Sequence, residues 1–288
     1  MALRKDFYQI IDEGHGIYRI FSLEGVYMEL FTGTDRALLL DTGVGLGDLV
    51  SAVRSVTQLP LTIVNTHGHY DHANGNDQFT NVPIYMHPDD WEVYSFYSRP
   101  ENREHTLNCS RHTKKGWNSP DYINIVPDDM ADEDYIHIRP VSLLPLHEGE
   151  IFDLGGITLE TIHVPGHTKG SCALLHRETG DLYIGDAANS HLVLSVFAAP
   201  IQEYKNTLEK LKKINFVRMR PSHEKDWLDK SVLDDYLDCI SNPDPDNFVE
   251  ASSPARPGDT DYMYIRRGYT ISDTKKPGFA SFIVKEKI

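Results

Sequence analysis

The segment that most restricts how this chain can fold is a short stretch crowded with side chains that bind metal ions. Within six positions stand His67, His69, Asp71 and His72. They directly follow an apolar run at 61–64 that has the length and composition of a buried strand. In an extended chain residues two apart point the same way, so His67 and His69 can reach one metal ion. Asp71 and His72, where the chain turns into a helix, can then reach a neighbouring position.

Three further candidate ligands stand later in the chain, each just beyond a strand-like run. They are His167, Asp186 and His223. Sheets of α/β proteins usually build their sites at the carboxyl ends of their strands. Each of the three taken singly is more typical of a hydrogen-bonded loop residue. Together with the first four they predict a metal site.

The pattern around these residues is that of a mixed α/β chain with two similar halves. The first half predicts strands at 17–21, 26–31, 37–40, 61–64 and 83–86, with a helix at 46–56. The second half predicts strands at 157–164, 172–176, 182–184 and 216–219, with helices at 200–214 and 226–240. Two such halves favour two sheets packed face to face with helices outside, which is a four-layer αββα sandwich. We expect residues 1–288 to form a single domain.

Two segments interrupt this duplication. Residues 88–145 exceed any ordinary connection, so we expect an inserted, partly helical cap or lid, or else a subunit interface. We predict that replacing 100–138 with a short Gly/Ser linker leaves a folded, metal-loaded protein that hydrolyses small activated esters but loses most of its kcat/KM for the natural substrate. Residues 243–288 are expected to be a C-terminal β extension. Its strands are predicted at 262–265, 269–271 and 279–284.

The motifs occur in a familiar order. The His-x-His-x-Asp-His run is followed by Gly-His-Thr-x-Gly-Ser around His167, by Gly-Asp ending at Asp186 and by Ser-His ending at His223. In these motifs, over residues 17–223, the chain resembles the metallo-β-lactamase superfamily. A carboxylate at 186, where β-lactamase branches with a cysteine ligand carry that cysteine, favours the glyoxalase II, lactonase and general hydrolase branches.

The resemblance implies a binuclear site with seven ligands. One metal takes His67, His69 and His167, the other takes Asp71, His72 and His223, and Asp186 bridges both. Imidazoles and carboxylates suit zinc, so we expect two zinc ions per chain, with iron or manganese as the alternatives. Paired metals lower the pKa of a shared water to about 7, which makes a protein nucleophile unnecessary. Asp71 is then placed to orient the hydroxide and to pass its proton to the leaving group.

The function that follows is a binuclear metallohydrolase in which a metal-bridging hydroxide attacks an ester, thioester, lactone or related carbonyl substrate. An iron-dependent enzyme acting on oxygen or a persulfide could use the same ligands and is the first alternative. A phosphodiesterase or nuclease is the second, and a non-catalytic, metal-stabilised binding protein is the third. The presence of all seven ligands argues against the third.

Several residues outside the ligand set are candidates for supporting roles. Asp41 closes the strand expected at 37–40 and resembles the family's acidic residue behind the metal histidines, although a plain turn carboxylate is the alternative. His191, five residues after Asp186, could contact substrate. Trp91, Tyr94 and Tyr97 share one face of an expected helix, which either encloses substrate or packs on the sandwich. Five basic residues could attract an anionic substrate or form a solvated face: Arg99, Arg103, Arg111, Lys114 and Lys115.

Composition narrows the class of partner. With 28 Lys and Arg against 43 Asp and Glu, the net charge of −15 opposes binding to nucleic acid and to acidic membranes. No apolar stretch approaches the ~20 residues that a membrane-spanning helix needs, and the N-terminus does not read as a signal peptide. The 3 cysteines lack paired spacing, which indicates reduced thiols. We expect a cytoplasmic enzyme with a small-molecule substrate, and a homodimer is compatible with the sequence.

Overall fold

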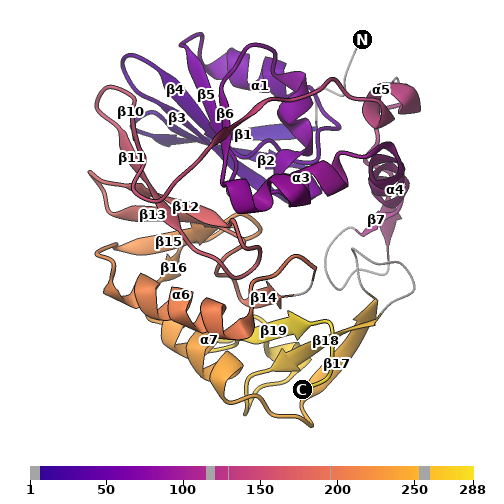
Figure 1. The fold of residues 1–288 in the computed structure, drawn as a ribbon, viewed down its shortest axis with the longest axis vertical. Helices are drawn as coiled ribbons and strands as arrows, with labels where there is room; N and C mark the ends of the chain where they lie inside the picture. The colour runs from indigo at the N-terminus through magenta and orange to yellow at the C-terminus, as the bar shows by residue number, and fades with distance from the viewer. Residues whose placement is uncertain (1–6, 115–120, 129, 195, 253–259) are drawn as a thin grey trace. The chain divides into compact units, whose positions relative to one another are not determined.

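The computed structural model describes residues 7–114, 121–128, 130–194, 196–252 and 260–288 (Figure 1). The remaining parts of the insert and of the C-terminal extension, 115–120, 129 and 253–259, lie outside the described residues. The chain consists of two compact units, and each is described by itself. The first comprises Met1–Leu146 and Glu150–Thr158, and the second comprises His147–Gly149 and Leu159–Ile288.

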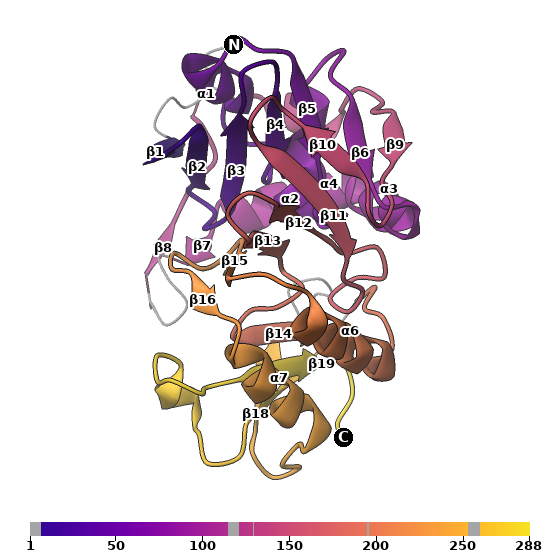
Figure 2. The same cartoon turned by 90° about the vertical axis from the view of Figure 1, so that its left-hand side faces the viewer.

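A seven-stranded sheet forms the centre of the first unit (Figure 2). In sheet order its strands are β1 (Tyr8–Gly14), β2 (Ile17–Ser22), β3 (Tyr27–Thr32), β4 (Ala37–Leu40), β5 (Leu61–Val64), β6 (Ile84–Met86) and β9 (Leu143–Pro145). The first four form an antiparallel meander, and β4, β5, β6 and β9 run parallel. The carboxyl ends of β4 and β5 therefore meet at one edge, where Asp41 and the histidine-rich loop leave the sheet.

Helices of the first unit are short. They are α1 (Leu49–Val56), α2 (Tyr70–Ala73), α3 (Trp91–Tyr97), α4 (Pro100–Ser110) and α5 (Asp132–Ile136), with 3-10 turns η1 (Asn74–Gln78) and η2 (Pro88–Asp90) and short strands β7 (Thr113–Lys114), β8 (Tyr122–Ile123) and β10 (Ile151–Asp153). Helix α1 begins at Leu49 and not at 46, because Asp48 caps it by accepting from the Ser51 amide at 2.9 Å. Its buried Leu49 and Val53 pack on the sheet core.

Residues of the insert pack into the apolar core of the first unit. Leu107 of α4 and Tyr135 of α5 are buried in one apolar cluster with Phe7, Val44 and Leu46. Replacing 100–138 with a linker would expose the other members of this cluster. The insert thus supplies part of the core of the first unit, and its role as a lid stays a prediction.

The second unit contains strands from two sheets and two amphipathic helices. Strands β11 (Thr158–His163), β12 (Cys172–His176), β13 (Asp181–Gly185), β15 (Arg218–Pro221) and β16 (Leu228–Asp229) are neighbours in that order, and helices α6 (Ile201–Lys213) and α7 (Val232–Ser241) pack on the same core. Because β13 and β15 are parallel, the residues that follow them, Asp186 and His223, emerge at the same edge. No helix within the described ranges is both long and apolar enough to cross a membrane.

The C-terminal residues build the other sheet of this unit. Its order is β14 (His191–Leu194), β19 (Ser281–Val284), β18 (Thr260–Ile265) and β17 (Phe248–Ser252). Two local predictions were wrong here. The helix expected from 226 starts at Val232, because Leu228 pairs with Met219 of β15. The strand expected at 269–271 is instead a turn entering the 3-10 helix η3 (Ile271–Asp273), which a Thr270–Asp273 capping box fixes.

Candidate metal centre

The four candidate ligands of the first unit lie on the loop and short helix that follow β5. His67 Nε2 and His69 Nδ1 are 3.1 Å apart. Two Zn–N bonds of about 2.0–2.1 Å at a tetrahedral angle separate their nitrogens by roughly 3.3 Å. The two imidazoles are therefore spaced as two ligands of one zinc ion would be.

Gly68 allows this arrangement because the loop passes very close to the following elements. Its amide donates to Asp90 Oδ2 at 2.8 Å. A Cβ at this position would lie 2.7 Å from the Asp90 carbonyl oxygen and 2.8 Å from the Tyr94 amide nitrogen. Any side chain would thus push the loop away from η2 and α3. Asp90 is fully buried, and no spacing in the sequence singled it out.

Asp41 contacts the candidate ligand that lies deepest in the first unit. Its Oδ2 is 2.8 Å from His72 Nδ1, and the imidazole is completely buried. Asp41 has a left-handed backbone, with φ of 65°, which is unfavourable for a residue other than glycine. Bonds from the Thr66 amide (2.7 Å) and hydroxyl (2.8 Å) to the two carboxylate oxygens stabilise that conformation.

Thr66, which the sequence analysis missed, sets the tautomer of His67. Its hydroxyl donates to Asp41, so the same oxygen accepts from His67 Nδ1 at 3.0 Å. A proton on Nδ1 places the lone pair of His67 on Nε2. The bond from His72 Nδ1 to Asp41 does the same for His72. Both imidazoles therefore present Nε2 in the form that binds a metal.

A buried polar network holds the backbone of α2. The His72 carbonyl accepts from the Thr42 amide at 2.8 Å and from Asn65 Nδ2 at 3.2 Å. Asn76 joins these two side chains, accepting from the Thr42 hydroxyl at 2.9 Å and donating to Asn65 Oδ1 at 2.8 Å. Asp71 Oδ2 lies 3.7 Å from His72 Nε2. Because the network is buried, it fixes the segment that carries both candidate ligands.

The second unit brings its three candidate ligands together around one carboxylate. Asp186 Oδ2 lies 3.7 Å from His167 Nε2 and 3.2 Å from His223 Nε2. One carboxylate oxygen thus lies near both imidazoles. His167 Nδ1 lies 2.8 Å from the Val193 carbonyl oxygen of β14, to which it donates, so its lone pair is also on Nε2. The sequence offered no signal for Val193, because a backbone carbonyl has no residue preference.

His191 is placed against the C-terminal sheet. Its Nδ1 is 2.8 Å from the Ser281 hydroxyl, and its ring is 5.5 Å from that of Phe279. Burial lowers its pKa, with the Glu224 carboxylate acting in the opposite direction. A neutral imidazole follows, and its expected contact with substrate stays a prediction.

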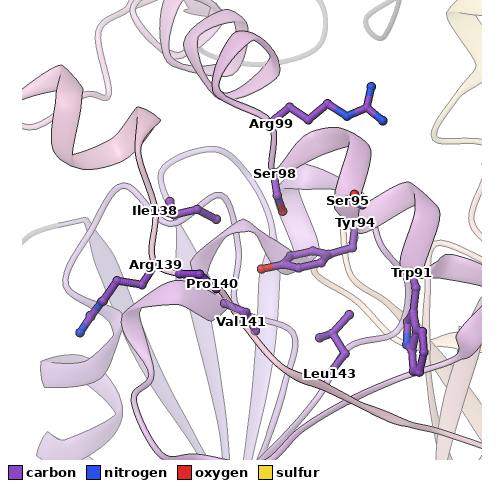
Figure 3. A pocket seen from close by; sticks show the side chains of 10 residues that line it. All are labelled: Trp91, Tyr94, Ser95, Ser98, Arg99, Ile138, Arg139, Pro140, Val141 and Leu143. Carbon is purple, nitrogen blue, oxygen red and sulfur yellow. The ribbon is translucent and has the colours of Figure 1, made fainter.

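The three aromatic candidates on α3 lie in two different environments. Trp91 and Tyr94 line a pocket of about 520 Å³ (Figure 3). Its other lining residues are Ser95, Ser98, Arg99, Ile138, Arg139, Pro140, Val141 and Leu143. Tyr97 instead stands edge-on to the His69 ring, with centroids 5.5 Å apart. Burial raises the pKa of Tyr94 to about 12, so its hydroxyl is neutral at physiological pH.

The arginines of the insert that the structure describes lie in different surroundings. Arg103 is buried, with only 1% of its surface exposed. Arg111 pairs with Asp132 at 2.5 Å, and Arg99 borders the pocket just described. Lys115 lies outside the described residues. The prediction of a solvated or substrate-attracting role was therefore wrong for Arg103.

Comparison with known proteins decides the family. Residues 25–223 match the family model of the Metallo-beta-lactamase superfamily. The chain belongs to this superfamily. A metallo-beta-lactamase from Pontibacter korlensis has the same fold, with a TM-score of 0.59 at 18% identity over 82% of this chain and 99% of that one. The resemblance and the fold class expected from the motifs are thereby confirmed.

Curated members of the superfamily are similar over part of their length. The acyl-coenzyme A thioesterase MBLAC2 of Gallus gallus is 31% identical over 173 residues, which are 54% of this chain and 55% of that protein. The Homo sapiens protein of the same name is 25% identical over 203 residues, 63% of this chain and 65% of that protein. The chain thus spans less than two thirds of these relatives.

Proposed function

We propose that this protein is a metal-dependent hydrolase that cleaves acyl thioesters. The observation that carries the proposal is the convergence of His67 Nε2 and His69 Nδ1 at 3.1 Å, a spacing suited to two zinc ligands. Membership in the metallo-beta-lactamase superfamily supports it, and the relatives named acyl-coenzyme A thioesterases favour a thioester among the carbonyl substrates.

We propose that seven side chains form a binuclear zinc centre. His67, His69 and His167 would hold one ion, Asp71, His72 and His223 would hold the other, and Asp186 would serve as a further ligand. The donor set supports this assignment, since it consists of imidazoles and carboxylates alone, as zinc prefers. When bound, the two ions would supply hydroxide at neutral pH and polarise the thioester carbonyl.

The protein's own groups then have separate roles. Asp41 and the Val193 carbonyl hold His72 and His167 in the tautomer with the lone pair on Nε2. Asp71 orients the attacking oxygen and accepts its proton. That oxygen adds to the carbonyl carbon, the carbon–sulfur bond breaks, and Asp71 returns the proton to the departing sulfur. The products are a carboxylate and a thiol.

A substrate panel tests the proposal. Zinc-loaded protein would be assayed with acyl-coenzyme A thioesters of several chain lengths, lactones and a phosphodiester, with thiol release followed by a chromogenic disulfide. Oxygen uptake would be recorded in parallel. We expect thiol release without oxygen consumption. Thiol release should be lost in the matched variant Asp186→Asn. Oxygen uptake, or cleavage of the phosphodiester alone, would contradict a thioesterase.

A further inference from the structure

Arg103 is one of the largest fully buried side chains of the described residues, and it comes from the insert. It lies on α4, four residues before the apolar Leu107. A buried guanidinium is costly unless its donors are satisfied. Its partners therefore show what the side chain is there to hold.

The contacts of Arg103 join α4 to α5 and to η1 in the first unit. Its Nε donates to the Tyr135 carbonyl of α5 at 2.5 Å, and a terminal nitrogen donates to the Asn74 carbonyl at 3.1 Å. The other terminal nitrogen is 3.6 Å from Asp77 Oδ1 of η1. The guanidinium carbon also lies 4.2 Å from the centre of the Tyr135 ring. The side chain is thus fixed on several sides.

Asn74 connects this contact to the candidate ligands. It caps the carboxyl end of α2, the helix carrying Asp71 and His72, and it is the first residue of η1. The Arg103 guanidinium donates to the Asn74 carbonyl at this junction. Removing the guanidinium would leave the Asn74 carbonyl buried without this donor.

Tyr135 extends the same contact to the loop that holds α2 from the other side. Its hydroxyl donates to the Val44 carbonyl at 3.0 Å and accepts from Asn74 Nδ2 at 3.4 Å. Two residues before Val44, the Thr42 amide donates to the His72 carbonyl at 2.8 Å. Arg103 and Tyr135 therefore reach both the end of α2 and the loop against which it is fastened.

We infer that Arg103 is a positioning residue, through which the insert holds Asp71 and His72 in place for the second metal ion. The inference rests on the proposed function only in assuming that these two residues bind metal. Groups that orient ligands typically change metal affinity 10- to 100-fold when they are lost. The His67–His69 pair precedes α2 and has its own support from Thr66 and Asp90, so the first ion should be less affected.

Stepwise cobalt titration of metal-free protein tests this, with Co²⁺ as the probe and its visible absorption as the readout. Arg103→Met keeps the apolar stem and removes the donors. We expect one of the two binding events to weaken 10- to 100-fold while the other changes less than about threefold. Arg103→Lys should restore part of the loss, because it keeps a buried cation and a donor. Unchanged affinities in Arg103→Met would overturn the inference.

Two further variants separate positioning from stability. Leu107→Ala lies on the same helix and loses only apolar packing, so it should lower the melting temperature and leave both cobalt affinities intact. Equal weakening of the same binding event in Leu107→Ala would show a merely structural role and overturn the inference. If Arg103→Met does not fold, Tyr135→Phe removes one hydroxyl and should weaken the same event three- to tenfold; unchanged binding there overturns it as well.

The outcome is separable from that of the proposed function. A wild-type protein that binds two cobalt ions but releases no thiol refutes the thioesterase and leaves the role of Arg103 standing. Thiol release by the wild type, combined with unaltered cobalt binding in Arg103→Met, supports the thioesterase and refutes the role of Arg103.

Discussion

Asp71 is the candidate ligand at which chemistry and metal binding can best be separated. Its side chain is 19% exposed, whereas that of the neighbouring His72 is completely buried. Asn in its place keeps an oxygen donor of the same shape but loses the charge and the ability to carry a proton. A single polar substitution at a partly exposed position should also leave the fold intact.

We therefore expect Asp71→Asn to lower kcat by roughly 10²- to 10⁴-fold in protein carrying its full metal content. The loss should be smaller for a thioester than for a matched oxoester, because a thiol of pKa roughly 8.5 departs with little help from a proton. Steady-state kinetics with both substrates, alongside elemental analysis, provide the measurement. Turnover at the wild-type rate would eliminate Asp71 as the proton carrier.

Glu24 is a second residue with an unusual environment. Its Oε1 accepts from the Val44 amide at 3.0 Å, and a Cβ on Gly43 would lie 2.9 Å from that oxygen. Burial raises the pKa of Glu24 from its ordinary 4.5 to about 7. The folded protein thus holds a proton that the unfolded chain releases between these two pH values.

The sign of the effect on stability follows from that difference. The contribution of Glu24 is fully present below pH 4.5 and is lost as pH rises through about 7. Glu24→Gln should flatten this dependence and raise the free energy of unfolding at pH 8 by roughly 2–3 kcal/mol. Urea unfolding of EDTA-treated protein from pH 4 to 8 measures it. The exposed Glu13→Gln provides a charge-matched control, and identical pH profiles in both variants would contradict the prediction.

At the scale of elements, α3 connects the candidate metal ligands with the pocket. Its first residue, Trp91, is 39% exposed, and the indole is held by a bond from Nε1 to the Met86 carbonyl at 3.1 Å. Its last residue, Tyr97, contacts the His69 ring. One helix of seven residues thus contacts both the pocket and a candidate ligand.

We predict that the pocket beside Trp91 takes the acyl chain of the proposed substrate. Trp91→Ala should raise KM for long-chain acyl thioesters about tenfold and leave that for acetyl thioesters within twofold, since the lost contact is apolar. Phe96→Ala, on the same helix but outside the pocket lining, is the control. An equal change for both chain lengths would place the acyl chain elsewhere.

The C-terminal sheet contributes to the site through one strand. β14 pairs in parallel with β19, and the Val193 carbonyl of β14 accepts from His167. Strand β19 of the C-terminal extension therefore supports β14, whose carbonyl holds the candidate ligand His167. Its position in the chain, far from every motif, hides this role from sequence patterns.

For the whole molecule, seven candidate ligands predict two metal ions per chain. Elemental analysis of zinc-loaded, gel-filtered protein should give close to two equivalents, falling to about one in His69→Ala and in His223→Ala. Removal of the ions by EDTA should lower the melting temperature, because ions that bind only the folded state stabilise it. A wild-type stoichiometry of one would contradict the binuclear centre.

The sequence by itself determined those features that depend on local spacing and on motif order. The strands at 37–40, 61–64 and 172–176 follow from short apolar runs bounded by turn residues, and the structure has them at the same residues. The histidine-rich run and the motifs around His167 were sufficient to identify the superfamily, which the family model confirmed. Zinc chemistry restricts these ligands to a few residue types at short spacing, so the pattern is visible without a fold.

Tertiary structure decided what surrounds the ligands. Thr66 and the Val193 carbonyl fix imidazole tautomers through contacts that no spacing encodes. Arg103 looked like part of a solvated basic face, but folding buries it against Asn74 because the insert contributes its own share of the core. A side chain's role here depends on which distant backbone groups lack partners, and only the folded chain brings those groups within hydrogen-bonding distance.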